Sequence, residues 1–367
     1  MSRALELARL GRGRTSPNPP VGAVVVSNGK IVGEGWHRKA GTPHAEVHAL
    51  VEAGPRARGA SLYVTLEPCC HRNKRTPPCV DAVLASGVSR VVVSAVDPNP
   101  RVRGKGIASL RRAGIEVATG VLEEEGRGVI REYAWHVKTG FPFVTLKLAQ
   151  SLDGKIATAR GESKWITGPA ARRVVQKMRA EADAVMAGAG TVRRDDPSLL
   201  PGGPLPRGSE AAGGRPLRVI VDGNLSIPPG AKLLADGMGP VLIACRRDAS
   251  PLRRRRLEER GAEIAAFPAV RGGIDLRRLM AVLGARGVMS VLVEGGGDLA
   301  ASLLAAGVVR EAVFFVAPVI IGGKDSVGSV GGASPRRLLD AIRLGEMRVE
   351  KIGRDILIRA DVTGGRD

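Results

Sequence analysis

The sequence predicts two consecutive α/β domains. Its 367 residues are enough for two domains at about 150 residues each. Segments rich in β-branched residues alternate with segments of helical apolar spacing, which is typical of layered α/β folds. Residues 139–142 (Thr-Gly-Phe-Pro) separate a helical pattern from a new strand pattern. We therefore expect one domain over residues 1–140 and a second over residues 141–367.

The first domain has the pattern of a mixed sheet covered by helices. Asn28-Gly29 is a two-residue turn signal between two alternating segments and predicts a hairpin. Val129, Ile130 and Val137 recur on one face of a long closing helix. In chain order, the predicted elements are a helix (3–10), the hairpin strands (21–27 and 30–36), a helix (44–53), a strand (61–66), a helix (79–86), a strand (90–96), a helix (107–113), a strand (115–118) and a helix (121–137).

The second domain has the pattern of a largely parallel sheet, because strand and helix segments alternate. Val174, Val175 and Met178 share one helix face, and Asp275 is placed to cap a helix. Residues 202–214 are rich in glycine and proline and predict a loop. In chain order, the predicted elements are a strand from Phe143, a helix (171–182), three strands (184–187, 217–221 and 241–244), two helices (252–260 and 275–285), a strand (288–293), a helix (298–306) and a strand (311–316).

The composition narrows the possible partners. Apolar residues make up 44% of the chain, and 56 basic against 36 acidic residues give a formal net charge of +20. The arginines are scattered along the chain, and five Phe, three Trp and two Tyr are few for a surface that stacks bases. Anionic small molecules are therefore favoured as partners, and we expect no nucleic-acid partner.

No segment predicts insertion into a membrane. The longest apolar run, residues 312–321, has ten residues and contains Pro318, which is about half of the length that spans a bilayer. Residues 1–14 carry charges throughout and lack the apolar core of a secretory signal. We therefore expect a cytoplasmic protein without disulfides and without a membrane partner.

The cysteines cluster in a pattern typical of a metal site. Cys69, Cys70 and Cys79 lie within eleven residues, and His44 opens a predicted helix upstream of them. One imidazole and two thiolates form a zinc set that leaves a fourth position for water, as catalytic sites do. Zinc lowers the pKa of such a water to about 7, and Glu46 is placed to carry protons. We expect His44, Cys69 and Cys79 as metal ligands and Glu46 as the catalytic residue.

Other interpretations of this cluster stay open. Cys70, His48 or His71 could supply a fourth ligand, which would make the zinc structural. The order His-x-Glu and then Pro-Cys is the signature of zinc nucleobase deaminases. That signature has two residues between its cysteines, whereas nine residues separate Cys69 from Cys79. The alternative functions are a nucleobase or tRNA deaminase fused to an unrelated α/β domain, and a non-catalytic binding protein stabilised by metal.

The second domain lacks the dinucleotide-binding glycine fingerprint but contains another candidate phosphate site. Residues 188–191 come nearest to G-x-G-x-x-G, and Arg193 stands at the third glycine position. Residues 294–297 (Glu-Gly-Gly-Gly) lie between a strand and a helix, where backbone N–H groups could cradle a phosphate. The alternative is a glycine-rich turn with Asp298 as the helix cap.

Ten short motifs, spread over nearly the whole chain, resemble those of one family. In the first domain they are TSPNPPVGA (15–23), HAE (44–46), LEPC (66–69), TPPC (76–79), DPNP (97–100) and GKGI (104–107). In the second domain they are TLKLA (145–149), SLDGK (151–155), ESKWIT (162–167) and DDP (195–197). The combination is similar to that of the bifunctional deaminase–reductases of riboflavin biosynthesis.

This resemblance implies a cytidine-deaminase-like three-layer α/β/α domain followed by a dihydrofolate-reductase-like α/β domain. It implies zinc-dependent hydrolytic deamination of 2,5-diamino-6-(5-phosphoribosylamino)pyrimidin-4-one in the first domain. It further implies NADPH-dependent reduction of the ribosyl side chain to a ribityl chain in the second. Reductase domains of this kind often pair, which implies a homo-oligomer. The family usually has eight residues between its cysteines, so Cys70 is an alternative to Cys69; we favour Cys69 because Pro68 fixes its backbone.

The resemblance also implies the binding residues. Asn18 is expected to contact the pyrimidine, and Arg179 suits the substrate phosphate through its bidentate fork. A second phosphate-binding arginine is missing after Leu199, where Arg207 is the nearest candidate. Trp165 could instead be a core residue, and Lys147 and Asp153 receive no role. The cofactor residues are Ala149, Trp165, Thr191, Asp195, Gly296, Gly297, Asp298, Leu299, Ala300, Ala301 and Ser302, and the substrate residues are Asn18, Ser163, Arg179, Leu199 and Glu294.

Overall fold

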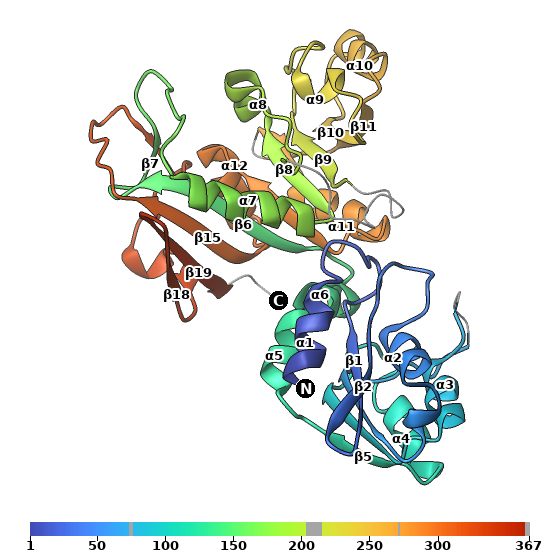
Figure 1. The fold of residues 1–367 in the computed structure, drawn as a ribbon. Coiled ribbons are helices and arrows are strands. Elements are labelled where there is room, and N and C mark those ends of the chain that lie inside the picture. The colour runs from blue at the N-terminus through green and yellow to red at the C-terminus, as the bar shows by residue number, and fades with distance from the viewer. Residues whose placement is uncertain (73–75, 203–214, 271, 364–367) are drawn as a thin grey trace. The chain divides into compact units, whose positions relative to one another are not determined.

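The computed structural model describes residues 1–72, 76–202, 215–270 and 272–363 (Figure 1). These residues form two compact units, the first over Met1–Gly140 and the second from Phe141 onward. Both units are α/β, as the sequence predicts. The loop predicted at 202–214 lies, apart from Gly202, outside the described residues. None of the described helices has the length and apolar character needed to cross a bilayer.

The N-terminal unit contains a five-stranded sheet in the order β2-β1-β3-β4-β5. The β1–β2 and β1–β3 pairs are antiparallel, and the β3–β4 and β4–β5 pairs are parallel. The elements are α1 (Ser2–Arg9), β1 (Gly22–Ser27), β2 (Lys30–Trp36), α2 (Ala45–Ala53), the 3-10 helix η1 (Gly54–Ala57), β3 (Ser61–Leu66), α3 (Cys79–Ser86), β4 (Arg90–Ala95), α4 (Lys105–Arg112), β5 (Glu116–Thr119), α5 (Glu123–Val129) and α6 (Arg131–Thr139).

Glycines on the hairpin allow a helix to approach each face of this sheet closely. A Cβ at Gly22 would lie 2.0 Å from the carbonyl oxygen of Ala4 in α1. On the opposite face, a Cβ at Gly33 would lie 2.2 Å from the carbonyl oxygen of Ala49 in α2. Gly33 pairs with Val25 across the hairpin, and Val25 is three residues from Gly22. Because side chains alternate between the faces of a strand, Gly22 and Gly33 point to opposite faces, so α1 and α2 cover different faces. The result is a three-layer α/β/α unit in which α2 is packed directly against the sheet.

The prediction of one continuous helix over 121–137 is wrong. The chain forms α5 and α6, and Ile130 between them has non-helical backbone angles (φ −105°, ψ 13°). Two glycines, Gly126 and Gly128, weaken this stretch as a helix. A Cβ at Gly126 would lie 2.3 Å from Ser94 Oγ, so the glycine is required for packing against β4. The break gives α6 its own direction and brings it to the cavity described below.

The C-terminal unit contains a ten-stranded sheet in the order β11-β10-β9-β8-β14-β6-β15-β19-β17, with β18 also paired to β19. All pairs from β11 to β15 are parallel, as the sequence predicts, and β15–β19 is antiparallel. The strands are β6 (Phe143–Ser151), β7 (Lys155–Ala157), β8 (Ala184–Gly188), β9 (Leu217–Val221), β10 (Val241–Arg246), β11 (Glu263–Phe267), β12 (Ala269–Val270), β13 (Gly273–Ile274), β14 (Ser290–Glu294), β15 (Val309–Ala317), β16 (Val327–Gly328), β17 (Arg343–Leu344), β18 (Arg348–Ile352) and β19 (Asp355–Thr363).

Helices cover both faces of this sheet. The helices are α7 (Pro169–Glu181), α8 (Ala189–Asp195), α9 (Lys232–Ala235), α10 (Pro251–Glu258), α11 (Leu276–Ala285), α12 (Gly297–Ala305) and the 3-10 helix η3 (Leu338–Asp340). Leu146 and Met186 pack with α11 and α12 on one face. Val185 and Ile220 pack with α8, α9 and α10 on the other, where Phe315 also packs beside α7.

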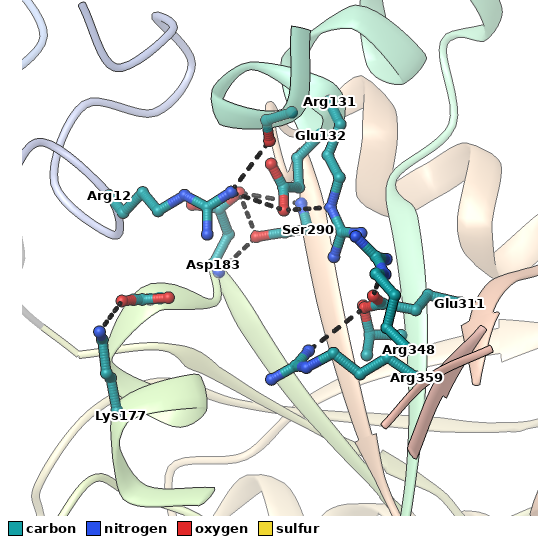
Figure 2. A network of polar contacts seen from close by, with 12 residues as sticks. Arg12, Arg131, Glu132, Lys177, Asp183, Ser290, Glu311, Arg348 and Arg359 are labelled. Atoms are coloured by element: carbon teal, nitrogen blue, oxygen red, sulfur yellow. Dashed lines mark hydrogen bonds and ion pairs between the residues drawn. The ribbon is translucent and has the colours of Figure 1, made fainter. Parts of the chain in front are cut away.

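The carboxylates of Asp183 and Glu311 lie at the amino edge of the parallel strands (Figure 2). Asp183, directly before β8, accepts hydrogen bonds from the backbone N–H of Ser290 at 3.0 Å and from its hydroxyl at 3.1 Å, which ties β8 to the start of β14. Glu311, at the start of β15, is 1% exposed and lies 3.7 Å from both Arg348 and Arg359. The carboxyl ends of the parallel strands lie together at the opposite edge, where α/β sheets bind ligands.

Candidate functional site

The N-terminal unit brings His44, Cys69 and Cys79 together. The three ligand atoms all lie within 4.8 Å of one another. His44 Nδ1 is 3.6 Å from Cys69 Sγ and 3.2 Å from Cys79 Sγ. Tetrahedral zinc with its usual bond lengths separates neighbouring ligand atoms by about 3.5 Å, so this set fits a zinc ion. Within the described parts of the chain the group contains Cys69 and not Cys70, and neither His48 nor His71 joins it.

Each member of this group is placed by the end of a regular element. His44 is the N-cap of α2, Cys69 follows β3, and Cys79 is the first residue of α3. The backbone N–H of Cys79 lies 3.4 Å from Cys69 Sγ, and helix N-termini favour thiolate. His44 Nε2 lies 3.4 Å from Thr76 Oγ1, a contact that orients the ring with Nδ1 toward the sulfurs.

Glu46 is the second residue of α2 and is 3% exposed. Burial raises the pKa of its carboxyl group, and the negative charge of Cys69 raises it further. A carboxyl group with a raised pKa holds and releases a proton more readily near neutral pH than a solvated one. Glu46 is therefore suited to proton transfer beside the His44–Cys69–Cys79 group.

A cavity of about 550 Å³ is lined by His44 and Cys69 of this group and by Glu46 and Asn18. This is the usual size of a small-molecule site. Asn18 Nδ2 lies 3.1 Å from His37 Nε2, and His37 Nδ1 lies 3.3 Å from the carbonyl oxygen of Pro43. Burial, followed by the charge of His44, lowers the pKa of His37 to about 4. A neutral His37 that donates to Pro43 must accept from Asn18, which leaves the Asn18 carbonyl oxygen available to a ligand.

The cavity is also lined by Asp97, Asn99, Tyr133 and His136, to which the sequence assigned no role. The Asp-Pro-Asn-Pro motif signals the first two, but its spacing assigns them no task. Tyr133 and His136 belong to α6, whose apolar pattern resembles that of any packed helix. Tyr133 donates a hydrogen bond to Asp97 Oδ1 at 3.2 Å, and burial raises the pKa of Asp97 to about 6.

In the C-terminal unit, Arg179 and Glu294 meet together with Lys147. Glu294, at the carboxyl end of β14, accepts from Arg179 Nη2 at 2.9 Å and from Lys147 Nζ at 3.2 Å, and its second oxygen pairs with Arg179 Nε. Burial alone would raise the pKa of Glu294, but the positive charges of Lys147 and Arg179 outweigh burial and lower it to about 2. Arg179 and Glu294 are both predicted substrate residues, but their pairing was not predicted from the sequence.

The predicted cofactor segment lies at the start of α12. Gly296 is the N-cap residue with φ 71°, and a Cβ there would lie 3.4 Å from Thr191 Oγ1. A Cβ at Gly297 would lie 2.9 Å from the carbonyl oxygen of Gly328. The side chains of Leu299 (7% exposed) and Ala300 (0%) face the core. This segment can therefore meet a phosphate mainly through its backbone N–H groups, as helix N-termini do.

Among the other predicted residues of this unit, the structure brings Ser163 and Asp195 into contact. Ser163 donates to Asp195 Oδ1 at 3.2 Å. Trp165 is 69% exposed with the Arg172 guanidinium 4.6 Å from its ring centroid, so the alternative that it is a core residue is wrong. The Leu199 side chain is 1% exposed and has φ 57°, so only its backbone is available to a ligand.

The remaining predicted positions are Ala149, Asp298, Ala301, Ser302 and Arg207. Ala149 lies in β6, and Asp298, Ala301 and Ser302 lie in α12, where the Ser302 hydroxyl donates to the Asp298 carbonyl oxygen at 2.7 Å. Arg207, the candidate for the missing arginine, lies outside the described residues. The structure therefore assigns no residue to that substrate-phosphate contact.

Replacing Glu294 with glutamine is expected to destabilise the C-terminal unit by about 3–5 kcal/mol, because the partly buried cations Lys147 and Arg179 lose their counter-charge. The folded-state pKa of about 2 lies below the ordinary value of 4.5, so this stabilisation is complete above pH 4.5 and is lost as the pH falls toward 2. Thermal unfolding of the wild type should therefore depend on pH between 4.5 and 2 more steeply than that of Glu294→Gln.

Glu263→Gln is the matched control for this prediction. Glu263 forms an exposed ion pair with Arg286 at 2.6 Å, so its loss should cost under about 1 kcal/mol. Equal destabilisation by the two variants would contradict the prediction.

Comparison with known proteins agrees with these two sites. The cytidine and deoxycytidylate deaminase zinc-binding region matches residues 1–95, and the RibD C-terminal domain matches residues 142–358. The riboflavin biosynthesis protein RibD of Aquifex aeolicus is 42% identical over 98% of this chain and 96% of its own length. That of Bacillus amyloliquefaciens is 42% identical over 100% of this chain and 96% of its own length.

Solved structures show the same likeness over the full chain. Acinetobacter baumannii RibD has a TM-score of 0.87 at 38% identity and covers 99% of this chain and 98% of its own. A diaminohydroxyphosphoribosylaminopyrimidine deaminase/5-amino-6-(5-phosphoribosylamino)uracil reductase from Thermotoga maritima has a TM-score of 0.85 at 35% identity, with 99% and 97% covered. The chain therefore belongs to the RibD family, the bifunctional zinc-dependent deaminases and NADPH-dependent reductases of riboflavin biosynthesis.

Proposed function

We propose that this enzyme first deaminates 2,5-diamino-6-(5-phosphoribosylamino)pyrimidin-4-one and then reduces the ribosyl chain of the product to a ribityl chain. The deaminase domain covers residues 1–140 and the reductase domain residues 141–367. The observation that carries the first step is the convergence of His44, Cys69 and Cys79 at a cavity that His44, Cys69 and Glu46 line. Full-length similarity to the Thermotoga maritima enzyme, which is named for both reactions, supports the order of the two steps.

In the deaminase domain, His44, Cys69 and Cys79 would hold the zinc ion. Zinc supplies a Lewis acid that acidifies water at neutral pH. Glu46 takes up a proton on its carboxylate and delivers it to the departing amine, for which its burial and raised pKa suit it. Asn18, oriented by His37, presents its carbonyl oxygen to the pyrimidine. Ammonia is the leaving group.

In the reductase domain, the backbone of residues 296–302 would hold the cofactor phosphates, together with Ala149, Trp165, Thr191 and Asp195. NADPH supplies the hydride that reduces the sugar carbon. Ser163, Arg179, the Leu199 backbone and Glu294 would contact the substrate. Because Lys147 and Arg179 already share one carboxylate, their remaining N–H groups are positioned to bind an anionic or carbonyl oxygen of the substrate.

The enzyme should also form a homo-oligomer through the surface formed by η3, β18 and the segment between them. Large apolar side chains are exposed there: Leu338 (83%), Leu339 (65%), Met347 (61%) and Val349 (62%). These residues belong to η3, β18 and the segment between them, and β18 and β17 are edge strands, which readily pair with another chain.

The free cysteines are consistent with a reducing, cytoplasmic location.

A coupled assay tests the two-step function. With the diaminopyrimidinone phosphate and NADPH, we expect ammonia release followed by NADPH oxidation. A zinc chelator should stop both when this substrate is supplied, because the reductase then lacks its own substrate. The chelator should not stop NADPH oxidation when the deaminated intermediate is supplied.

Two results would contradict this assignment. NADPH oxidation from the diaminopyrimidinone in the presence of chelator would show that deamination need not come first. Release of ammonia from tRNA, with none from the phosphoribosyl pyrimidine, would favour the alternative of a nucleic-acid deaminase.

A further inference from the structure

Asp97 stands out among the cavity residues that the proposed chemistry leaves unused. We propose that Asp97 is a specificity-determining residue of the deaminase cavity, whose Oδ2 accepts a hydrogen bond from an amino N–H on C5 or C6 of the pyrimidine. This inference rests on the proposed substrate, since it concerns the recognition of that ring. Asp97 lies two residues after the end of β4, is 5% exposed and lines the same cavity as Glu46.

The backbone around Asp97 is held by a neighbouring buried carboxylate. Glu67, 3% exposed, accepts hydrogen bonds from the backbone N–H groups of Gly104 and Gly106 at 2.9 Å, of Ile107 at 3.2 Å and of Asp97 itself at 3.3 Å. A Cβ at Gly106 would lie 2.1 Å from the carbonyl oxygen of Pro68. The loop that carries Asp97 is therefore fixed against the end of β3, which gives Asp97 a defined position.

The two carboxylate oxygens of Asp97 differ in their partners. Oδ1 accepts from the backbone N–H of Asn99 at 2.8 Å and from the Tyr133 hydroxyl at 3.2 Å. Oδ2 accepts no hydrogen bond from residues 1–72, 76–202, 215–270 and 272–363, and it is not among the buried atoms without a partner, so it is open to the cavity that Asp97 lines. The hydrogen bonds from Asn99 and Tyr133 to Oδ1 orient the side chain, and Oδ2 remains to accept a hydrogen bond from a ligand in the cavity.

A carboxylate oxygen that opens into a cavity accepts an N–H group of a ligand through a charge-assisted hydrogen bond, which is stronger than a bond between neutral groups. The proposed substrate carries such groups at C5 and C6, away from the amine that leaves from C2. A ring without these groups would displace water from Oδ2 without replacing its hydrogen bond, and such a mismatch lowers affinity. Asp97 would thus select aminated pyrimidinones over simpler ones.

The substitution Asp97→Asn tests this assignment. Asparagine keeps an oxygen for Asn99 and Tyr133 but replaces the free acceptor with an NH₂ donor. For the phosphoribosyl substrate we expect KM to rise about 10- to 100-fold, with kcat changed less than KM and zinc content unchanged. Glu116→Gln, on the exposed strand β5, is the matched acid-to-amide control and should keep the wild-type KM.

Two ring probes test the selectivity itself. For wild type, inhibition by 2,5,6-triaminopyrimidin-4-one should be about 10- to 100-fold tighter than inhibition by 2-aminopyrimidin-4-one, and Asp97→Asn should lose this preference. An Asp97→Asn enzyme that keeps the preference, or that shows only a lower thermal midpoint, would overturn the role of Asp97 and leave the proposed function standing. A wild type that binds both rings equally would overturn this role, whereas the proposed substrate would fall only if the coupled assay showed no ammonia release from it.

Discussion

Replacing Glu46 with glutamine is expected to reduce the rate of ammonia release by about 10²- to 10⁴-fold. Glutamine fills nearly the same volume in this buried position but cannot take up and release a proton. Glu46→Ala should abolish ammonia release in the same way. Neither change removes a member of the His44–Cys69–Cys79 group, so zinc content should stay near the wild-type value. The measurements are ammonia release from the diaminopyrimidinone and zinc by elemental analysis.

The reductase half provides the internal control for both variants. NADPH oxidation with the deaminated intermediate should keep its wild-type rate, because Glu46 belongs to the other unit. A Glu46→Gln enzyme that deaminates at the wild-type rate would show that another group moves the proton.

Alanine substitutions of the three clustered cysteines are expected to differ in zinc content and in ammonia release. Cys69→Ala and Cys79→Ala each remove a sulfur from the metal group, so zinc content and ammonia release should both be lost. Cys70→Ala should keep zinc and most of the activity, because Cys70 lies outside that group. Burial raises the pKa of the Cys70 thiol, which disfavours the thiolate that zinc requires.

Cys70→Ala is also the matched control, since it makes the same substitution one residue away. If Cys70→Ala lost zinc while Cys69→Ala retained it, the ligand assignment would have to be exchanged between the two cysteines.

Much of the deaminase half could be predicted because its signals are local. His44 and Glu46 are two positions apart, and Cys69 and Cys79 stand where a strand ends and a helix begins. The tertiary fold had only to bring three short segments together. The hairpin at Asn28-Gly29 was predictable for the same reason, because turn chemistry acts over two residues.

The remaining features depend on distant partners. The pairing of Arg179 and Lys147 with Glu294 spans 115 and 147 residues, and no spacing rule encodes such a contact. The close packing of Gly126 on Ser94 is a tertiary constraint that the helical pattern of this stretch does not reveal. Strand β18 has the sequence Arg-Val-Glu-Lys-Ile, which is too polar to predict a strand before its pairing with β19 is known.

The anchor formed by Glu67 touches only main-chain N–H groups of the loop that it holds. The identity of most loop side chains is therefore irrelevant to that anchor, with Gly106 as the exception because no larger residue fits there. Substrate preference in this half of the enzyme can consequently drift during evolution, or be redesigned in the laboratory, by exchanging rim residues without loss of the scaffold beneath them.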